Sequence, residues 1–228
     1  MALTRPREKD AELAARLEAA GFTPIFVPVV AYESLPEGMA ALEAALDEPW
    51  DWAVLTSPEA AARFLAALKG RPAPPVAALG AGTARVLEAA GVRPAFAPPR
   101  AYGRVLAETL PLAPGARVLW PTSARAGRAL GDRLAERGAR VSRLDVYTLK
   151  ERRPTAEERS RAATAAVVML GSPSAARAWR AAGLPLLPAA AIGESTARVA
   201  RELGFAPVTA AAEPGLAGWV AALKALFD

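Results

Sequence analysis

Short apolar runs alternate with longer stretches of helical spacing along this chain. Five of the runs are typical of buried strands: 53–56, 76–79, 117–120, 167–170 and 189–192. The stretches between them are rich in Ala, Leu, Glu and Arg; in the first, Leu13 and Leu17 recur at helical spacing and Gly21 follows as a closing residue. Strands that alternate with helices of this length predict parallel sheets built from βαβ units.

The second half of the chain repeats the pattern of the first. Residues 51–98 and 166–211 contain, in the same order, a strand followed by Ser-Pro and a strand followed by a Gly-x-x-Thr-Ala turn. A repeat of half the chain length indicates one small domain present twice rather than a solenoid. We therefore expect an α/β fold of two similar flavodoxin-like parallel-sheet domains, with a ligand held between two facing sheet edges.

Two extended segments with polar flanks follow the first strand-helix-strand piece of each copy. They cover residues 29–35 and 144–152, and each contains one tyrosine, Tyr32 or Tyr147. Their matching positions predict a two-strand connector between the domains. Residues 151–163, rich in Glu and Arg, predict a solvated helix or loop.

The composition excludes several kinds of chemistry. The 228 residues include no cysteine and no histidine, which excludes disulfides, thiolate catalysis and Ser-His-Asp triads and disfavours a metal site. No apolar run is long enough to span a bilayer, so we expect a soluble, cytoplasmic protein. The net charge of +5 fits either a polyanionic ligand or a plain preference for arginine at the surface. The second interpretation is favoured because no basic block stands out.

Two Ser-Pro turns are candidate ligand sites. Ser57-Pro58 and Ser172-Pro173 each follow an apolar strand and precede a helix, where Ser suits the N-cap and Pro the first helical position. Capping alone explains such turns. Their place at the carboxyl ends of strands, where open α/β sheets bind ligands, nevertheless predicts substrate contacts. The candidates are Thr56, Ser57, Ser172 and Ser174.

The two Gly-x-x-Thr turns are a second pair of candidates. Small residues let a ligand oxygen approach backbone amides, and the threonine adds a hydroxyl donor, although tight turn geometry explains the glycines equally well. The spacing matches neither a P-loop nor a dinucleotide fingerprint. The candidates here are Gly80, Thr83, Gly193, Ser195 and Thr196.

Two further polar residues stand outside these turns. Arg5 precedes the first helix, where it either meets an anion or is solvated. Tyr147 lies in a connector, where packing is the simpler explanation. No pair of acidic residues stands out as an acid-base couple.

Six short motifs in order resemble the uroporphyrinogen-III synthase family over essentially the whole chain. They are Thr4-Arg5-Pro6, Thr56-Ser57-Pro58, Gly80 to Ala84, Val146-Tyr147-Thr148, Ser172-Pro173-Ser174 and Gly193 to Ala197. The resemblance implies discontinuous domains, in which 1–30 joins 152–228 and 36–146 forms the second domain. Segments 29–35 and 144–152 would then form a two-stranded hinge.

The resemblance also implies a reaction. The family cyclises hydroxymethylbilane, a linear tetrapyrrole rich in carboxylates, with inversion of the last ring and loss of water. By position, Tyr147 resembles the tyrosine that assists departure of the hydroxyl, and Thr196 the threonine of the second Gly-x-x-Thr motif, so these two become the catalytic candidates. Arg5, Thr83 and the Ser and Thr residues of the turns become substrate-binding candidates.

The resemblance implies no cofactor. We expect no nucleic-acid partner, because the five Trp are scattered and no basic face stands out, and no membrane partner, because no apolar run spans a bilayer. We also expect a monomer that can make transient contact with hydroxymethylbilane synthase. The chain departs from the family pattern at Thr122, Gly171 and Glu194. The alternative is a non-catalytic two-domain module that binds a small polyanion. A pair of response-regulator-like domains is disfavoured because the aspartate expected at a strand end is absent.

Overall fold

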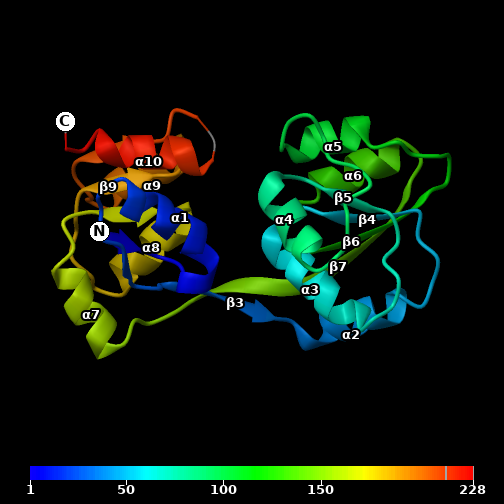
Figure 1. Ribbon diagram of the computed structural model, residues 1–228, viewed down its shortest axis with the longest axis horizontal. Helices are drawn as coiled ribbons and strands as arrows, with labels where there is room; N and C mark the ends of the chain where they lie inside the picture. The colour runs from blue at the N-terminus through cyan, green and yellow to red at the C-terminus, as the bar shows by residue number, and fades with distance from the viewer. Residues whose placement is uncertain (214, 228) are drawn as a thin grey trace. The chain divides into compact units, whose positions relative to one another are not determined.

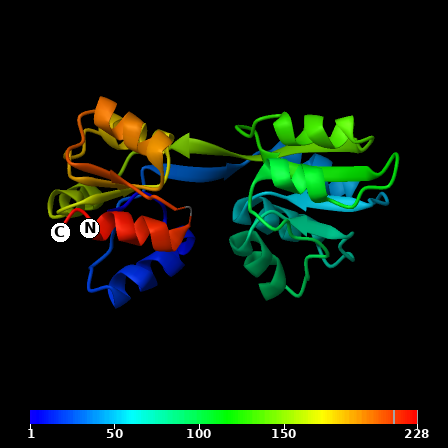
Figure 2. The same cartoon turned by 90° about the horizontal axis from the view of Figure 1, so that it is seen from above.

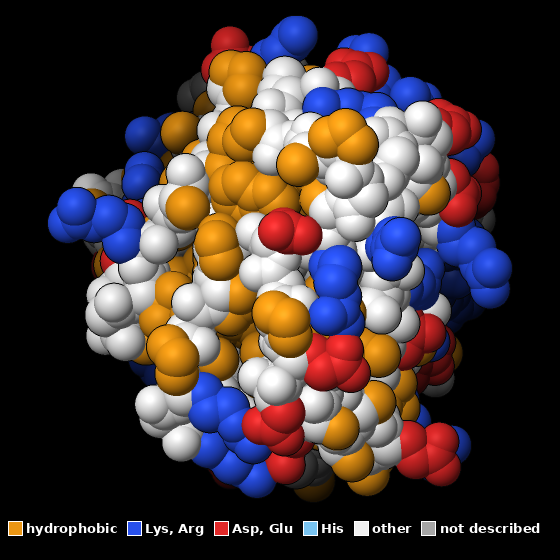
Figure 3. Space-filling view, turned by 90° about the vertical axis from the view of Figure 1, so that its right-hand side faces the viewer, with side chains coloured by type: hydrophobic (Ala, Val, Ile, Leu, Met, Phe, Trp, Pro, Cys, Tyr) orange, Lys and Arg blue, Asp and Glu red, His pale blue; other side chains and the backbone are white. Residues whose placement is uncertain are grey.

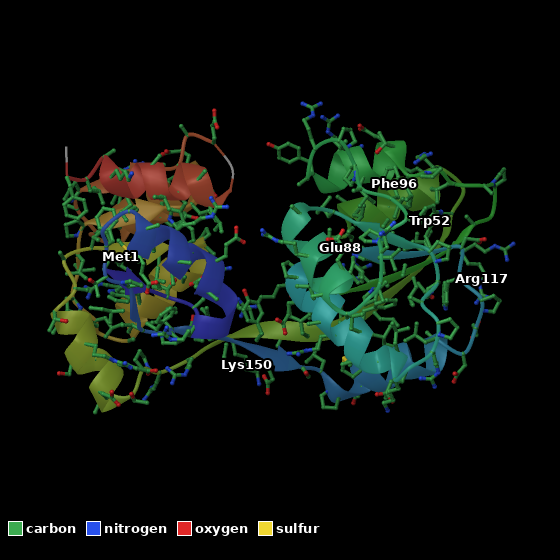
Figure 4. All side chains as sticks on the ribbon, viewed as in Figure 1. Met1, Trp52, Glu88, Phe96, Arg117 and Lys150 are labelled. Carbon is green, nitrogen blue, oxygen red and sulfur yellow. The ribbon has the colours of Figure 1, made fainter. Side chains whose placement is uncertain are left out.

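The computed structural model describes residues 1–213 and 215–227, apart from the side chains of Glu8 and Lys9. The chain divides into two compact units, of which unit 1 contains residues 1–31 and 150–228 and unit 2 contains residues 32–149. It therefore passes from one unit to the other twice. The second passage is at Lys150, which is labelled in Figure 4.

Unit 1 contains a five-stranded parallel sheet with the strand order β10-β9-β8-β1-β2. Strand β9 and the helices of this unit are labelled in Figure 1. The strands are β1 (Ala2–Leu3), β2 (Ile25–Phe26), β8 (Val168–Leu170), β9 (Ala189–Ala191) and β10 (Val208–Ala210). The helices are α1 (Arg7–Ala19), α7 (Ala156–Ala163), α8 (Pro173–Ala181), α9 (Glu194–Glu202) and α10 (Leu216–Lys224). Helices α1 and α10 share one apolar core with the sheet, and α8 and α9 cover its other face (Figure 2).

Unit 2 contains a second five-stranded sheet with the order β3-β7-β6-β4-β5. The strands are β3 (Val30–Ser34), β4 (Trp52–Leu55), β5 (Val76–Ala78), β6 (Arg117–Ser123) and β7 (Arg140–Glu151). The helices are α2 (Pro36–Ala45), α3 (Pro58–Leu68), α4 (Ala81–Ala89), α5 (Gly103–Thr109) and α6 (Ala129–Glu136). Helices α2, α3 and α4 bury one face of the sheet, and α5 and α6 bury the other (Figure 2).

Each sheet is completed by a strand-helix-strand piece from elsewhere in the chain. The first piece, β1-α1-β2, pairs with β8, and the middle piece, β6-α6-β7, pairs with β4. Strand β3 runs antiparallel to β7, because Leu35 donates a backbone hydrogen bond to Val146 while Arg152 donates one to Val29. The predicted α/β class, with two similar parallel-sheet domains, is confirmed.

Strand β6 is longer than its apolar run predicts. The sequence favours an end near Trp120, because Pro121 cannot donate to a ladder. The recorded pairing with β4 covers Val118 and Leu119, whereas the pairing with β7 continues to Ser123. Pro121 therefore pairs with Leu144 of β7 and lies beyond the two residues of β6 that pair with β4. Its missing N–H interrupts neither of those two pairs.

The segment after β7 forms a capped helix. The Thr155 hydroxyl accepts the amide of Glu158 at 3.2 Å, and the Glu158 carboxylate accepts the amide of Thr155 at 2.7 Å. The guanidinium of Arg152 donates to both oxygens of that carboxylate, at 2.6 and 3.1 Å. Burial opposes ionisation of Glu158, but these hydrogen bonds outweigh it and lower its pKa.

Among the described residues, no helix is long and apolar enough to cross a membrane.

Replacing Glu158 with glutamine is expected to reduce the free energy of unfolding by about 1 kcal/mol at pH 7. A carboxylate whose pKa is lower in the folded state stabilises the fold at pH values above its ordinary pKa of 4.5. This contribution disappears as the pH falls through the lowered pKa of the folded state. Urea denaturation from pH 7 to pH 3 should therefore show the two proteins converging in acid. Glu157→Gln, which alters a neighbouring side chain that is 81% exposed, should change little at any pH.

Candidate functional site

The strand register of unit 2 brings several of the predicted site residues to one edge of its sheet. Ala53 pairs with Leu119, and Ser123 pairs with Tyr147. Extending the first pairing by four residues places Ser57 level with Ser123 and therefore with Tyr147. Because Leu55 pairs with Ala78, Gly80 lies at the same level. These residues share the carboxyl edge, the side on which open α/β sheets bind ligands.

Tyr147 and Ser57 are joined by a hydrogen bond. Their side-chain oxygens are 2.9 Å apart, and either can be the donor. The Ser57 oxygen also accepts the amide of Ala60 at 3.0 Å, so the predicted N-cap of α3 is confirmed. Tyr147 is only 7% exposed, and the ring of Tyr32 lies 6.0 Å away between centroids. The two connector tyrosines thus meet in unit 2.

The surroundings of Tyr147 favour its protonated form. Burial raises the pKa of the Tyr147 phenol, the hydrogen bond with Ser57 lowers it, and the net shift is upward. Glu59 and Tyr32 add to the rise, and Arg63 opposes it. The phenol is therefore protonated at neutral pH and can act as a proton donor.

Glu59 and Arg63 form a partly buried ion pair beside this phenol. The pair spans one turn of α3 with an N–O distance of 2.7 Å, and the Glu59 side chain is 5% exposed. Sequence reasoning missed these residues as neighbours of Tyr147. Their i, i+4 spacing was visible in the sequence, but their burial depends on the packing of α3.

The Gly-x-x-Thr turn of unit 2 opens α4. Gly80 is in an extended conformation that any residue can adopt, and a Cβ there would be 3.4 Å from the Cβ of Ala101. Thr83 is 3% exposed, and its amide donates to the Gly80 carbonyl at 3.0 Å. Gly80 is thus partly exposed, whereas the Thr83 side chain is enclosed.

The equivalent edge of unit 1 has the same construction. Leu170 pairs with Ala191, so Ser172 lies level with Gly193. The Ser172 oxygen accepts the amide of Ala175 at 3.1 Å and lies 3.0 Å from the Ser174 oxygen. Both predicted Ser-Pro caps are therefore present.

The second Gly-x-x-Thr turn divides into open and buried positions. A Cβ on Gly193 would meet no atom within 4 Å, and Ser195 is exposed at the start of α9. Thr196 is only 1% exposed, in the first turn of that helix. Gly193 and Ser195 are thus accessible, whereas the Thr196 side chain is enclosed.

Arg5 lies at the same edge of unit 1 and is paired. Because Leu3 pairs with Met169, Arg5 lies level with Gly171. Its guanidinium forms an ion pair with Asp10, whose side chain is 1% exposed. Burial raises the pKa of Asp10 and Arg5 lowers it, with a net upward shift. Sequence reasoning missed Asp10, since nothing in its spacing distinguishes it from the exposed acids of α1.

Two of the departures from the family pattern are Glu194 and Thr122, and the structure shows what surrounds each side chain. The carboxylate of Glu194 is paired with Arg201 at 2.7 Å. Thr122 is 2% exposed, so its side chain is enclosed in the sheet. Glu194 therefore does not present an uncompensated negative charge beside Gly193.

The third departure, Gly171, makes room for an indole. A Cβ on Gly171 would lie 3.2 Å from Cη2 of Trp219, closer than an ordinary contact. Trp219 is fully buried and donates from its ring nitrogen to the carbonyl of Ala190 at 2.8 Å. A serine or threonine at position 171 does not fit without displacing that ring.

We predict that Gly171→Ser lowers the free energy of unfolding by about 1–2 kcal/mol through this crowding. Combining it with Trp219→Leu should cost less than the sum of the two single changes, because the smaller side chain relieves the contact. Urea denaturation of the four proteins measures this coupling. Strictly additive losses would refute the proposed clash.

A cavity of about 680 Å³ lies elsewhere in unit 2, between α6 and β7. Its lining includes Arg128 and Arg143 but also Asp132 and Asp145, so neither charge dominates. Trp120, which also lines it, belongs to the core on the α6 side of the sheet, whereas Tyr147 belongs to the α3 side. The cavity is therefore separate from the tyrosine.

The described residues contain no group of three or more acidic side chains placed to hold a metal ion. On the face drawn in Figure 3, side chains of both charges are interspersed with apolar ones. The polar groups that the described residues bring to the two edges are hydroxyls, backbone amides, the Tyr147 phenol and the Arg5–Asp10 ion pair.

Comparison with known proteins gives consistent matches. A family model described as uroporphyrinogen-III synthase HemD matches residues 11–221. A chloroplastic uroporphyrinogen-III synthase of Oryza sativa subsp. japonica is 36% identical over 235 residues, with 96% of this chain and 77% of that protein covered.

Solved structures with similar folds include two proteins named as uroporphyrinogen-III synthase or synthetase. A mutant uroporphyrinogen III synthase from the extremely thermophilic bacterium Thermus thermophilus matches with a TM-score of 0.59 at 24% identity, covering 99% of this chain and 97% of that one. The uroporphyrinogen-III synthetase of Helicobacter pylori 26695 matches with a TM-score of 0.66 at 22% identity, covering 91% and 94%. At these identities the two structures bear on the fold alone.

Proposed function

The chain belongs to the uroporphyrinogen-III synthase family, and from that premise we propose that it converts hydroxymethylbilane to uroporphyrinogen III. The reaction closes a linear tetrapyrrole, expels water and inverts the last pyrrole ring. Enzymes of this family are cofactor-free and cyclising. The proposal therefore assigns every role to side chains and amides of this chain.

The first step assigned to the protein is loss of the hydroxymethyl oxygen. The phenol proton of Tyr147 passes to that oxygen, the carbon–oxygen bond breaks with its electron pair on oxygen, and water leaves. The neighbouring pyrrole nitrogen supplies electrons and keeps its hydrogen, which gives an electrophilic, positively charged azafulvenium and leaves a phenolate. Attack by the substituted carbon of the last ring, followed by rearrangement, closes the macrocycle and releases the proton that restores the phenol.

The observation that carries this proposal is the hydrogen-bonded Tyr147 at the carboxyl edge of unit 2. It is the side chain in the candidate set that combines a transferable proton with a pKa raised above its ordinary value, chiefly by burial. A positioned general acid of this kind contributes about 10²- to 10⁴-fold to a rate.

We assign substrate binding to the turns at the two carboxyl edges. The first amides of a helix have no intrahelical partner and favour anions, so the starts of α4 and α9 suit the carboxylates of the bilane. The proposed binding residues are Arg5, Thr56, Gly80, Ser172, Ser174, Gly193 and Ser195. Ser57 contacts Tyr147 instead, and we assign Thr83 and Thr196 to support of their turns, because their side chains are enclosed.

We further propose that the protein works as a cytoplasmic monomer that receives the bilane from hydroxymethylbilane synthase. Unassisted closure of the bilane gives the type I isomer, so brief contact with the supplying enzyme would limit that loss. The rice relative is named as chloroplastic. Sedimentation of this protein alone and with the supplying enzyme tests the monomeric state and the contact.

The function is tested by turnover. Hydroxymethylbilane is generated in situ with a small amount of purified protein, the products are oxidised, and the type I and type III porphyrins are separated. We expect many molecules of type III per protein molecule. A module that only binds polyanions would leave ring closure unassisted and give type I alone, and that result would reject the synthase.

A further inference from the structure

We propose that Ser57 is a positioning residue for Tyr147, donating its hydroxyl hydrogen to the phenol oxygen so that the phenol proton points to the substrate. This inference rests on the proposed function and assigns Ser57 a task beyond capping α3. It fixes the direction of a hydrogen bond whose two oxygens are 2.9 Å apart.

The N-cap already uses part of the hydrogen-bonding capacity of Ser57. A hydroxyl has one hydrogen to donate and two lone pairs that accept. The amide of Ala60 occupies one lone pair at 3.0 Å. The hydrogen of Ser57 remains available, and the phenol oxygen of Tyr147 is the partner that the structure records for it.

The helix favours donation in this direction. Ser57 lies at the N-terminus of α3, an 11-residue helix whose positive dipole end faces its oxygen. An amide that donates to a hydroxyl polarises it and strengthens it as a donor. The chain of donors therefore runs from the Ala60 amide to the Ser57 hydroxyl and on to the Tyr147 phenol.

Such a chain serves the proton transfer in two ways. The phenol cannot donate to Ser57 while it accepts from it along the same contact, so its own proton is free for the departing hydroxyl. After the transfer, the Ser57 hydroxyl stabilises the phenolate, and hydrogen bonds to charged groups are the stronger class. Ser57 itself neither gains nor loses a proton.

The internal repeat supplies a contrast. Ser172 caps α8 with the same geometry, accepting from Ala175 at 3.1 Å. Its neighbouring hydroxyl belongs to Ser174 rather than to a tyrosine. A Ser-Pro cap thus forms without a phenol, and the contact between Ser57 and Tyr147 is an addition to the cap.

A double-mutant cycle tests whether Ser57 acts through the tyrosine. We expect Ser57→Ala to lower kcat for type III formation about tenfold with KM within about twofold, and to cause no further loss in the Y147F background. Ser57→Thr, which retains a hydroxyl, should restore most of kcat. Thr155→Ala removes a comparable cap from α7 and should leave kcat unchanged.

Equal losses of kcat from Ser57→Ala in both backgrounds would overturn the proposal, as would a Ser57→Ala protein with normal kcat. Circular dichroism confirms that each variant is folded. If the wild-type protein forms no type III product, the proposed function fails. The direction of the hydrogen bond between Ser57 and Tyr147 can then still be tested by a measurement that needs no turnover.

That measurement is the alkaline absorbance titration of the tyrosines, with Y147F used to assign Tyr147. If Ser57 donates, Ser57→Ala should raise the pKa of Tyr147, because the phenolate loses a donor. The pKa of Tyr147 is also influenced by Tyr32 on β3 and by Glu59 and Arg63 on α3. The substitution leaves these three residues in place, so their effect on that pKa is the same in both proteins. A lowered or unchanged pKa would show that Ser57 is not the donor.

Discussion

Tyr147→Phe is expected to lower kcat for type III formation by about 10²-fold, the lower end of the range for a lost general acid. KM should stay within about twofold, because the phenol is assigned a role in the transition state rather than in carboxylate binding. The ring remains in the core of α2, α3 and the sheet, so the fold should persist. Steady-state kinetics with separation of the porphyrin isomers measures both constants.

Tyr102→Phe is the matched control for this substitution. Tyr102 is also in unit 2, at the N-cap of α5, but its side chain is 55% exposed and distant in sequence from the β7 edge. Its kcat should equal that of the wild type. If Tyr147→Phe weakens binding of the tetrapyrrole product as much as it slows turnover, the assigned role is wrong.

Gly38→Ala is expected to produce the largest loss of stability, about 3 kcal/mol. Gly38 lies in the first turn of α2 against the backbone of β7, and a Cβ there would be 1.9 Å from the carbonyl oxygen of Asp145. Backbone atoms cannot rotate away as side chains do, so α2 and β7 must separate. Urea denaturation monitored by far-ultraviolet circular dichroism measures the loss.

Because Val146 and Tyr147 follow the point of contact, the Gly38→Ala protein should also form type III product more slowly. Gly103→Ala provides the comparison, since a Cβ on Gly103 at the start of α5 meets no atom within 4 Å. It should be neutral or slightly stabilising, because alanine is the better helix former. Similar stabilities for the two variants would contradict the close approach of α2 to β7.

The fold was largely predictable from the sequence because its signals are local. Apolar runs placed the strands within a few residues, and Gly21 adopts the positive φ of 84° that ends α1. Ser57 and Ser172 cap helices as their Ser-Pro dipeptides predicted. Periodicity alone does not give the pairing of a strand-helix-strand piece with a sheet remote in sequence, which the strand register shows.

The contacts within the candidate site were not predictable in this way. The hydrogen bond between Ser57 and Tyr147 joins residues 90 positions apart and depends on the register of three strands. The burial of Asp10 and the enclosure of Thr196 depend on side-chain packing, which residue type does not reveal. Glycine at 171 was noted as a departure, but its reason required the position of Trp219.

The most direct test of the account is the isomer formed in a single turnover. Hydroxymethylbilane is mixed with an excess of wild-type protein, the reaction is stopped at successive times, and the oxidised porphyrins are separated. We predict that the product is type III and that it forms faster than type I does in buffer alone. Type I as the product, at the rate of the unassisted reaction, would contradict the account.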